Sequence, residues 1–235
     1  MRLINSVLLP STDIPNEQQC SLSCSTDILA SLDFDKIVKT SDFSDSQVKL
    51  KKEYLNKFIE NGFPNRKLEN WKFSDINQII NKNINQLSFY NDYSSSNKID
   101  TSIFIDGLEH NKIFFINGGV EKIDFSYEDQ DQIEIIEDPK SDNILDNNNS
   151  LIDLNKAFTN KSYRILIKKN YFFKKPLIVY HTTNHKIKSK NINLSLEFKL
   201  EQNSSLRLID FFNDDNDKNF INIFYNFDLK KDAIL

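Results

Sequence analysis

The stretch NLSLEFKLEQNSSL, residues 193–206, recurs as NIFYNFDLKKDAIL at residues 222–235, without a gap and at an offset of 29. In both copies an alternating apolar and polar strand leads into a polar corner, where Asn203 matches Asp232. Asn and Asp tolerate left-handed backbone better than other non-glycine residues, so both corners suit a sharp turn. A repeat of about 20–50 residues built of strand, corner and strand is typical of stacked coils.

The rest of the chain divides into a helical part and a strand part. Apolar residues at helical spacing predict helices over 44–62, capped by Ser44 or Ser46 with Gly62 after its end, and over 150–158. Beyond residue 100, apolar and polar residues alternate with a period of two, which predicts strands, and residues 117–119 predict a turn. The sequence therefore predicts a mainly β fold, in which an N-terminal α-helical region precedes the first coils of a parallel, right-handed β-helix. A β-hairpin meander is the alternative.

The predicted organisation has four parts. They are a flexible polar leader (1–40), a helical region (41–100), a mixed connector (101–160) and the start of the β-helix core (161–235). Because the chain ends inside an apolar strand, we expect a fragment of a longer protein, since an uncovered end of such a core favours aggregation.

Charge and hydropathy limit the partners. The 30 Lys and Arg balance 34 Asp and Glu, for a net charge of -4, which argues against nucleic acid. No apolar run approaches the roughly 20 residues of a membrane helix. Cys20 and Cys24 are the only cysteines, which favours a reducing compartment over a disulfide framework. We expect a cytoplasmic protein, with a plastid as the weaker alternative.

No constellation for catalysis or metal binding stands out. The chain lacks G-x-S-x-G, P-loop, G-x-G-x-x-G and H-E-x-x-H motifs. His110, His181 and His185 are the only histidines, and a role in packing or at the surface suits all three better than metal binding. The acidic runs 127–138 and 213–219 read as solvated loops. We therefore predict no catalytic, cofactor-binding or metal-binding residue in this chain.

A second stretch, FPNRKLENWKFSDI at residues 63–76, gathers Pro64, several charges and the only tryptophan. The residues themselves predict a structural latch. Arg66 and Glu69 can pair at i,i+3, while Trp71 and Phe73 are expected to bury against the core. On this reading Trp71→Ala costs several kcal/mol, as large-to-small core changes do.

This stretch resembles the N-terminal motif of SufD, an iron–sulfur cluster assembly protein. The pattern G-[LF]-P-[TN]-R-[KR]-x-E-x-W-[KR]-[YF] is met by Gly62, Phe63, Pro64, Arg66, Lys67, Glu69, Trp71, Lys72 and Phe73. IFFINGGV (113–120) is similar to the family's FVNG turn, and the run 151–181 to its LN-x-AF segment. The resemblance covers about residues 45–235.

The resemblance implies a scaffold subunit, not an enzyme, that acts with SufB and SufC to assemble clusters, with most of the family's regions of contact with SufB and SufC missing from this segment. The cluster would be handled by the whole complex, with no cofactor bound by this segment, and neither nucleic acid nor membrane would be a partner. Two alternatives stay open. One is a β-solenoid protein that acts on polysaccharides or binds glycans, and the other is a small stand-alone protein that binds SufB or SufC.

Overall fold

The computed structural model describes residues 2–8, 23–84, 87–89, 103–137, 149–183, 187–213 and 218–235. Its helices are α1 (Ser23–Thr40), α2 (Asp45–Asn61), α3 (Ile76–Asn83) and α4 (Ser150–Phe158), with short 3-10 turns η1 (Glu69–Trp71) and η3 (Gln130–Gln132). Its strands are β1 (Arg2–Leu8), β2 (Asn111–Ile116), β3 (Gly119–Asp124), β4 (Ile133–Glu137), β5 (Ser162–Ile167), β6 (Leu177–Thr182), β7 (Asn191–Leu200), β8 (Leu208–Asn213) and β9 (Phe220–Leu229).

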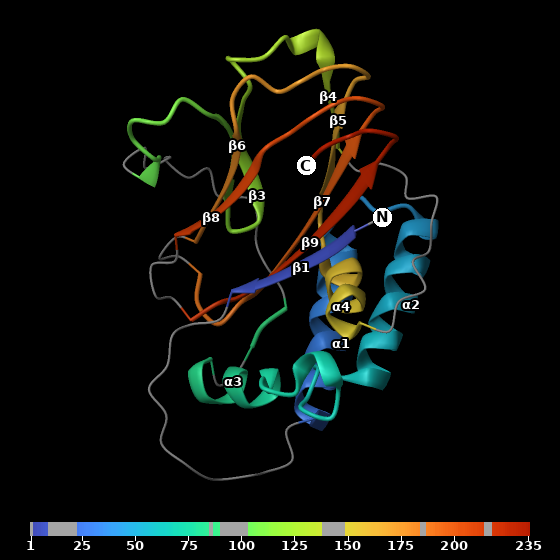
Figure 1. The fold of residues 1–235 in the computed structure, drawn as a ribbon. Coiled ribbons are helices and arrows are strands. Elements are labelled where there is room, and N and C mark those ends of the chain that lie inside the picture. The colour runs from blue at the N-terminus through green and yellow to red at the C-terminus, as the bar shows by residue number, and fades with distance from the viewer. Residues whose placement is uncertain are drawn as a thin grey trace.

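The strands form two mixed sheets (Figure 1). One has five strands in the order β1-β9-β7-β5-β4, and the other has four in the order β3-β2-β6-β8. Within them β5, β7 and β9 run parallel, as do β2, β6 and β8. The remaining strands, β1, β4 and β3, pair antiparallel with their neighbours and lie at sheet edges.

The register predicted from the repeat is confirmed. β7 and β9 pair in parallel so that Asn193 lies opposite Asn222 and Leu200 opposite Leu229, which is the offset of 29. Both predicted corners also adopt left-handed backbone, with φ of 56° at Asn203 and 59° at Asp232. The Asn203 amide then donates to the Lys231 carbonyl, which links one corner to the next.

The predicted fold class, a mainly β chain opening a parallel β-helix, is wrong. The described residues form a mixed α/β fold with two small mixed sheets and four α-helices, and they give no indication of a solenoid. The repeat determined how β7 pairs with β9, but it carries no information about what borders that pair. The antiparallel strands β1 and β4 form the two edges of the five-stranded sheet. The antiparallel strand β3 forms one edge of the four-stranded sheet. The hairpin meander is equally excluded for β7 and β9, because they are parallel.

The main core lies between the two sheets. The apolar residues of β7 that the alternation predicts to be buried are Leu194, Leu196, Phe198 and Leu200. They meet residues such as Ile113 and Val179 from the other sheet. Phe114 and Tyr180 on the opposite face of that sheet are also covered, by residues 103–105. Burial on both faces explains why β2 and β6 read as continuous apolar runs instead of alternating.

The helices make a second core at the start of β9. Phe58 of α2, Leu154 and Phe158 of α4 and Phe34 of α1 pack with Phe220, the first residue of β9. In Figure 1 these helices gather at one end of the five-stranded sheet, while α3 lies to the left of their lower ends. None of the described helices is long and apolar enough to cross a membrane.

Local signals place α2 correctly. Ser44 is its N-cap and forms a capping box with Gln47, and Gly62 follows the helix with a φ of 64°. The structure differs from the predicted flexible leader, because β1 and α1 lie within residues 1–40. α1 is held from a distance, since its Asp33 carboxylate accepts a hydrogen bond from the Phe89 amide at 2.8 Å.

Candidate functional site

The motif stretch connects α2 to α3, and its inner anchor is Phe63. This ring makes edge contacts with Phe58, at 5.1 Å between centroids, and with Phe220, at 5.7 Å. Pro64 beside it is buried as well. Gly62, with its positive φ, provides the backbone turn that directs Phe63 inward.

The rest of the motif faces outward. Arg66, Lys67, Glu69 and Lys72 are exposed, and Trp71 is half-buried against the helical core. Phe73 is 91% exposed, so the prediction that it buries is wrong. The expected pairing of Arg66 with Glu69 is also not what the described residues show, because Arg66 Nη2 donates to Gln78 Oε1 at 3.3 Å. The stretch is a latch through Phe63, while its charges and Phe73 face solvent.

This division predicts opposite outcomes for two phenylalanines of one motif. Phe63→Ala should lower the free energy of unfolding by about 3 kcal/mol, because it empties a packed site between α2 and β9. Phe73→Ala should change it by less than about 0.5 kcal/mol, as substitutions of exposed residues do. Urea unfolding of both variants checks this, and equal losses would contradict the assignment of Phe63 as the anchor. The half-buried Trp71 should fall between the two.

Among the described residues, the two histidines lie in separate packing environments. Cys20 and His185 lie outside the described residues, and Cys24 lies in α1. His110 is buried, with Nδ1 2.6 Å from the Leu108 carbonyl and Nε2 2.8 Å from the Tyr180 hydroxyl. A carbonyl only accepts, so Nδ1 carries a proton and donates it to Leu108. His110 therefore holds a loop against β6.

His181 joins the two sheets. Its ring stacks between Phe115 and Phe212, with centroids 5.4 and 4.8 Å away. Its Nε2 lies 3.1 Å from both Asp210 Oδ1 and the Tyr225 hydroxyl, and that hydroxyl donates to Asp210 at 2.5 Å. Burial, together with the Asp210 charge, raises the pKa of Tyr225 well above its ordinary value, so the hydroxyl keeps its proton.

A small cavity adjoins His181 between the sheets. It measures about 10 Å³, room for about one water molecule. Thr182, Thr183 and Gly118 supply its polar side, and apolar residues of β7 and β9 supply the other. This space is too small for an organic substrate, and the buried histidine beside it packs between Phe115 and Phe212.

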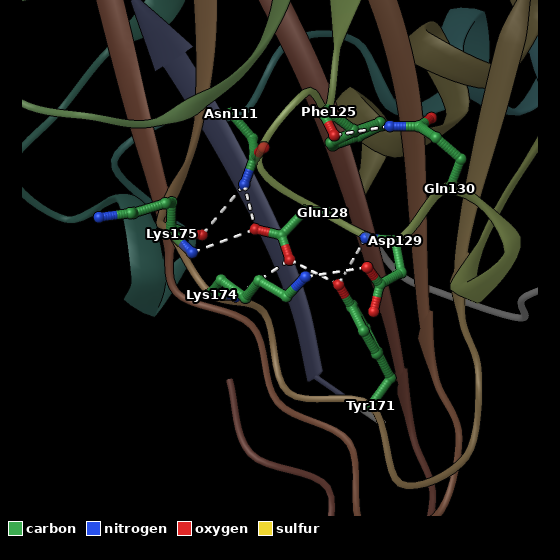
Figure 2. Close-up of polar contacts among 8 residues, drawn as sticks. All are labelled: Asn111, Phe125, Glu128, Asp129, Gln130, Tyr171, Lys174 and Lys175. Atoms are coloured by element: carbon green, nitrogen blue, oxygen red, sulfur yellow. Dashed lines mark hydrogen bonds and ion pairs between the residues drawn. The ribbon is translucent and has the colours of Figure 1, made fainter.

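Glu128 is the centre of a polar cluster of side chains and backbone amides (Figure 2). Its carboxylate is buried and accepts four hydrogen bonds. Oε1 accepts from Asn111 Nδ2 at 2.7 Å and from the Lys175 amide at 3.1 Å. Oε2 accepts from the Tyr171 hydroxyl at 2.8 Å and from the Lys174 amide at 3.0 Å. One side chain thus ties the segment after β3 to β2 and to the loop between β5 and β6.

These donors control the charge of Glu128. Burial by itself raises the pKa of the carboxyl, but the hydrogen bonds from Lys174, Asn111, Lys175 and Tyr171 outweigh burial and hold the pKa below its ordinary value. Glu128 is therefore ionised at neutral pH with every lone pair engaged. The prediction that residues 127–138 form a solvated loop is wrong at this position, because the acidic run hides a buried structural carboxylate.

Buried amides fasten α4 to the five-stranded sheet. Asn155 Nδ2 donates to the carbonyls of Leu194 at 2.9 Å and Asn222 at 2.8 Å. In the opposite direction, Asn222 Nδ2 donates to the Leu151 carbonyl of α4 at 2.8 Å, and it also donates to Asn193 Oδ1 at 3.1 Å. Alternation along β7 would leave its polar face in water, but α4 covers the beginning of that face, where Asn193 is buried and its Oδ1 accepts a hydrogen bond from Asn222.

Two buried side-chain oxygens in this region, Asp153 Oδ1 and Asn222 Oδ1, have no hydrogen-bond partner among the described residues, and only Asp153 can carry a charge. Asp153 lies on α4 and is 2% exposed. Burial raises the pKa of Asp153 to about 6, and the nearby charge of Lys57 on α2 offsets this only in part. Asp153 is therefore a titratable group in the α2–α4 contact.

This predicts a stability that declines as pH rises. The folded pKa of about 6 exceeds the ordinary 3.8, so the folded state binds more protons between those values. The free energy of unfolding should fall by about 2–3 kcal/mol from about pH 4 to pH 8 through this group. Asp153→Asn should abolish that decline and be more stable than the wild type at pH 8. Urea titrations across this range test it, with Asp35→Asn, an exposed helical aspartate, as control; identical pH profiles for wild type and Asp153→Asn would contradict it.

The sequence contained weak signals for these groups. The matched asparagines at 193 and 222 of the repeat are hydrogen-bonded to each other, because Asn222 Nδ2 donates to Asn193 Oδ1. Nothing local distinguishes Glu128 from its acidic neighbours. In the part of the chain that is described, no group of three or more His, Cys, Asp and Glu side chains is placed to hold a metal ion.

A scan of protein-family models finds none that matches this chain, and a search of curated proteins finds no match either. The fold and these clusters together define a mixed α/β protein whose buried polar groups join segments distant in sequence. The resemblance to SufD rests on the motif residues.

Proposed function

We propose that this chain is a non-enzymatic scaffold subunit that acts with SufB and SufC in iron–sulfur cluster assembly, as its resemblance to SufD implies. The observation that carries the proposal is the use made of the buried polar groups. Glu128, Asn155 and His181 each bridge segments far apart in sequence, and each does so through hydrogen bonds that hold elements together. These side chains therefore have a structural role.

The motif residues fit the same role. Asn155, from the segment similar to LN-x-AF, fastens α4 to β7 and β9, and Phe63, from the motif at Gly62, fastens α2 to β9. In this proposal the protein is cytoplasmic, this segment binds no cofactor of its own, and the cluster is the cargo of the whole complex. Nucleic acid and membranes are not partners.

Purified chain mixed with SufB and SufC tests this proposal. We expect a complex that co-elutes in size-exclusion chromatography with light scattering. Asn155→Ala serves as a structural control, because a loosened α4 should weaken the complex in proportion to the lost stability. Separate elution of all three proteins at micromolar concentration would overturn the proposal. The proposal would also be overturned if SufB and SufC bound this chain only when the chain was unfolded.

A further inference from the structure

The loop of residues 66–73 presents apolar and positive groups together. We call it the basic loop. Phe73 is 91% exposed and Leu68 48% exposed, and Arg66, Lys67 and Lys72 stand around them with Glu69 as the single acid. Lys72 Nζ lies 5.9 Å from the Phe73 ring centroid. A phenylalanine so exposed leaves apolar surface in water, which is unfavourable unless something covers it.

The basic loop is held in shape before any partner arrives. Backbone amides of Leu68, Trp71 and Ser74 donate to carbonyls of Asn65, Leu68 and Trp71 at 2.8–3.1 Å. Trp71 packs inward on the helical core. Little conformational entropy remains to be lost when Leu68 and Phe73 are covered, and such preorganisation favours binding.

A complementary surface lies on the same chain. Residues 119–137, the acidic edge, comprise β3, η3, β4 and the turns between them. They carry seven acids and one lysine, Lys122. One acid, Glu128, is buried, and three others pair with lysines, whereas Glu121, Asp131 and Glu134 are exposed. Three large apolar side chains are also exposed among them, namely Ile123 at 36%, Tyr127 at 39% and Ile135 at 37%.

The two surfaces lie far apart within one molecule. In Figure 1 the loop between α2 and α3 is at the base, while β4 and the turn that precedes it are at the top. A contact between them therefore requires two copies. Since β3 and β4 are edge strands, their charges also oppose strand-to-strand addition and direct a partner to the side chains.

We propose that the basic loop of one copy docks on the acidic edge of a second copy, head to tail. Phe73 and Leu68 are covered by Ile123, Tyr127 and Ile135, while Lys67 and Lys72 face Glu121 and Glu134. The contact is heterologous, so copies join into a ring or an open chain. With exposed charges at its rim it is a weak association that salt screens. This goes beyond the scaffold function and does not depend on SufB or SufC.

Charge reversal on one chain tests the pairing. Sedimentation velocity at increasing concentration should show self-association of the wild type at about 50 mM salt and its loss at about 500 mM. Lys67→Glu with Lys72→Glu should weaken it at least tenfold, and so should Glu121→Lys with Glu134→Lys. The chain carrying all four substitutions should regain association to within about threefold of the wild type, because both surfaces have exchanged sign.

The controls distinguish self-association from unfolding and from binding of the basic loop to a membrane. All four positions are exposed, so circular dichroism and the unfolding midpoint should match the wild type. A wild type that stays monomeric at low salt up to about 1 mM overturns the proposal, and so does a fourfold variant that stays monomeric. Co-sedimentation with phosphatidylserine vesicles is run in parallel. Loop-dependent vesicle binding by a monomeric wild type would assign the basic loop to a membrane surface and overturn the proposal.

Discussion

Asn155→Ala should lower the free energy of unfolding by about 4 kcal/mol. The side chain is fully buried, and its amide donates to the carbonyls of Leu194 and Asn222 on adjacent strands. Its Oδ1 and its carbonyl also receive the Thr159 hydroxyl. Alanine removes the donor to the Leu194 and Asn222 carbonyls, while the Thr159 hydroxyl keeps the backbone carbonyl of residue 155 as its acceptor. Each unpaired buried group costs about 1–3 kcal/mol, and the lost side-chain packing adds to this. Alanine's better helix propensity recovers less than about 1 kcal/mol.

Asn61→Ala is the matched control for this change. Asn61 also lies in a helix and donates to a carbonyl, that of Lys57, but it does so in solvent. It should lose less than about 0.5 kcal/mol. Chemical denaturation of both variants measures the contrast. A loss below about 1 kcal/mol at Asn155 would show that α4 is held by apolar packing alone. Hydrogen exchange should locate the damage at α4 and at the beginnings of β7 and β9.

Glu128→Ala should be as damaging, with a loss of about 4 kcal/mol at neutral pH. Four donors converge on this carboxylate, and two of them are backbone amides of Lys174 and Lys175 that no rotamer change can redirect. Glu128→Gln tests the charge separately. The amide keeps one acceptor oxygen but sets its NH2 group against two donors, so a loss of about 2–3 kcal/mol is expected. Glu121→Gln, on the exposed face of β3, should be neutral within about 0.5 kcal/mol.

The pH dependence of the free energy of unfolding is a second test of the charge on Glu128. Its folded pKa is lowered from the ordinary 4.5, so its contribution is fully present above that value and is lost as pH falls through the folded pKa. The advantage of the wild type over Glu128→Gln should therefore shrink on acidification from about pH 5 to pH 3. This window reaches below that of Asp153 and overlaps it near pH 4–5, but the sign is opposite, so the two groups are separable by their variants. A constant advantage at all pH values would contradict ionisation of Glu128.

Local sequence was sufficient for the elements whose causes are local. The capping box at Ser44 and the left-handed residues at Asn203 and Asp232 follow from side chains within a few positions. The register of β7 with β9 was readable because a one-residue slip would turn every buried side chain outward. The α4 helix was found from Leu151, Leu154 and Phe158 at helical spacing.

The remaining features depend on what lies across space. Nothing in the repeat reveals that β1 pairs with β9, or that α4 covers the polar face of β7, and the fold class was wrong for this reason. Phe73 was predicted to bury because aromatic residues usually do, yet Phe63 occupies the position beside Phe220. Glu128 differs from the exposed acids only through Asn111, Tyr171 and two amides that approach from other segments. The sequence alone does not show which distant groups will approach a given side chain.

The parallel pairings also bear on the order in which the chain folds. Strands β5 and β7, β6 and β8, and β7 and β9 pair at sequence separations of 33, 31 and 29, whereas β1 pairs with β9 at separations of 213–225. Closing the longer loop costs about 2 kcal/mol more in chain entropy. We therefore expect the parallel strands to nucleate and β1 to be added late. Substitutions in β7 would slow refolding, while those in β1 would mainly speed unfolding.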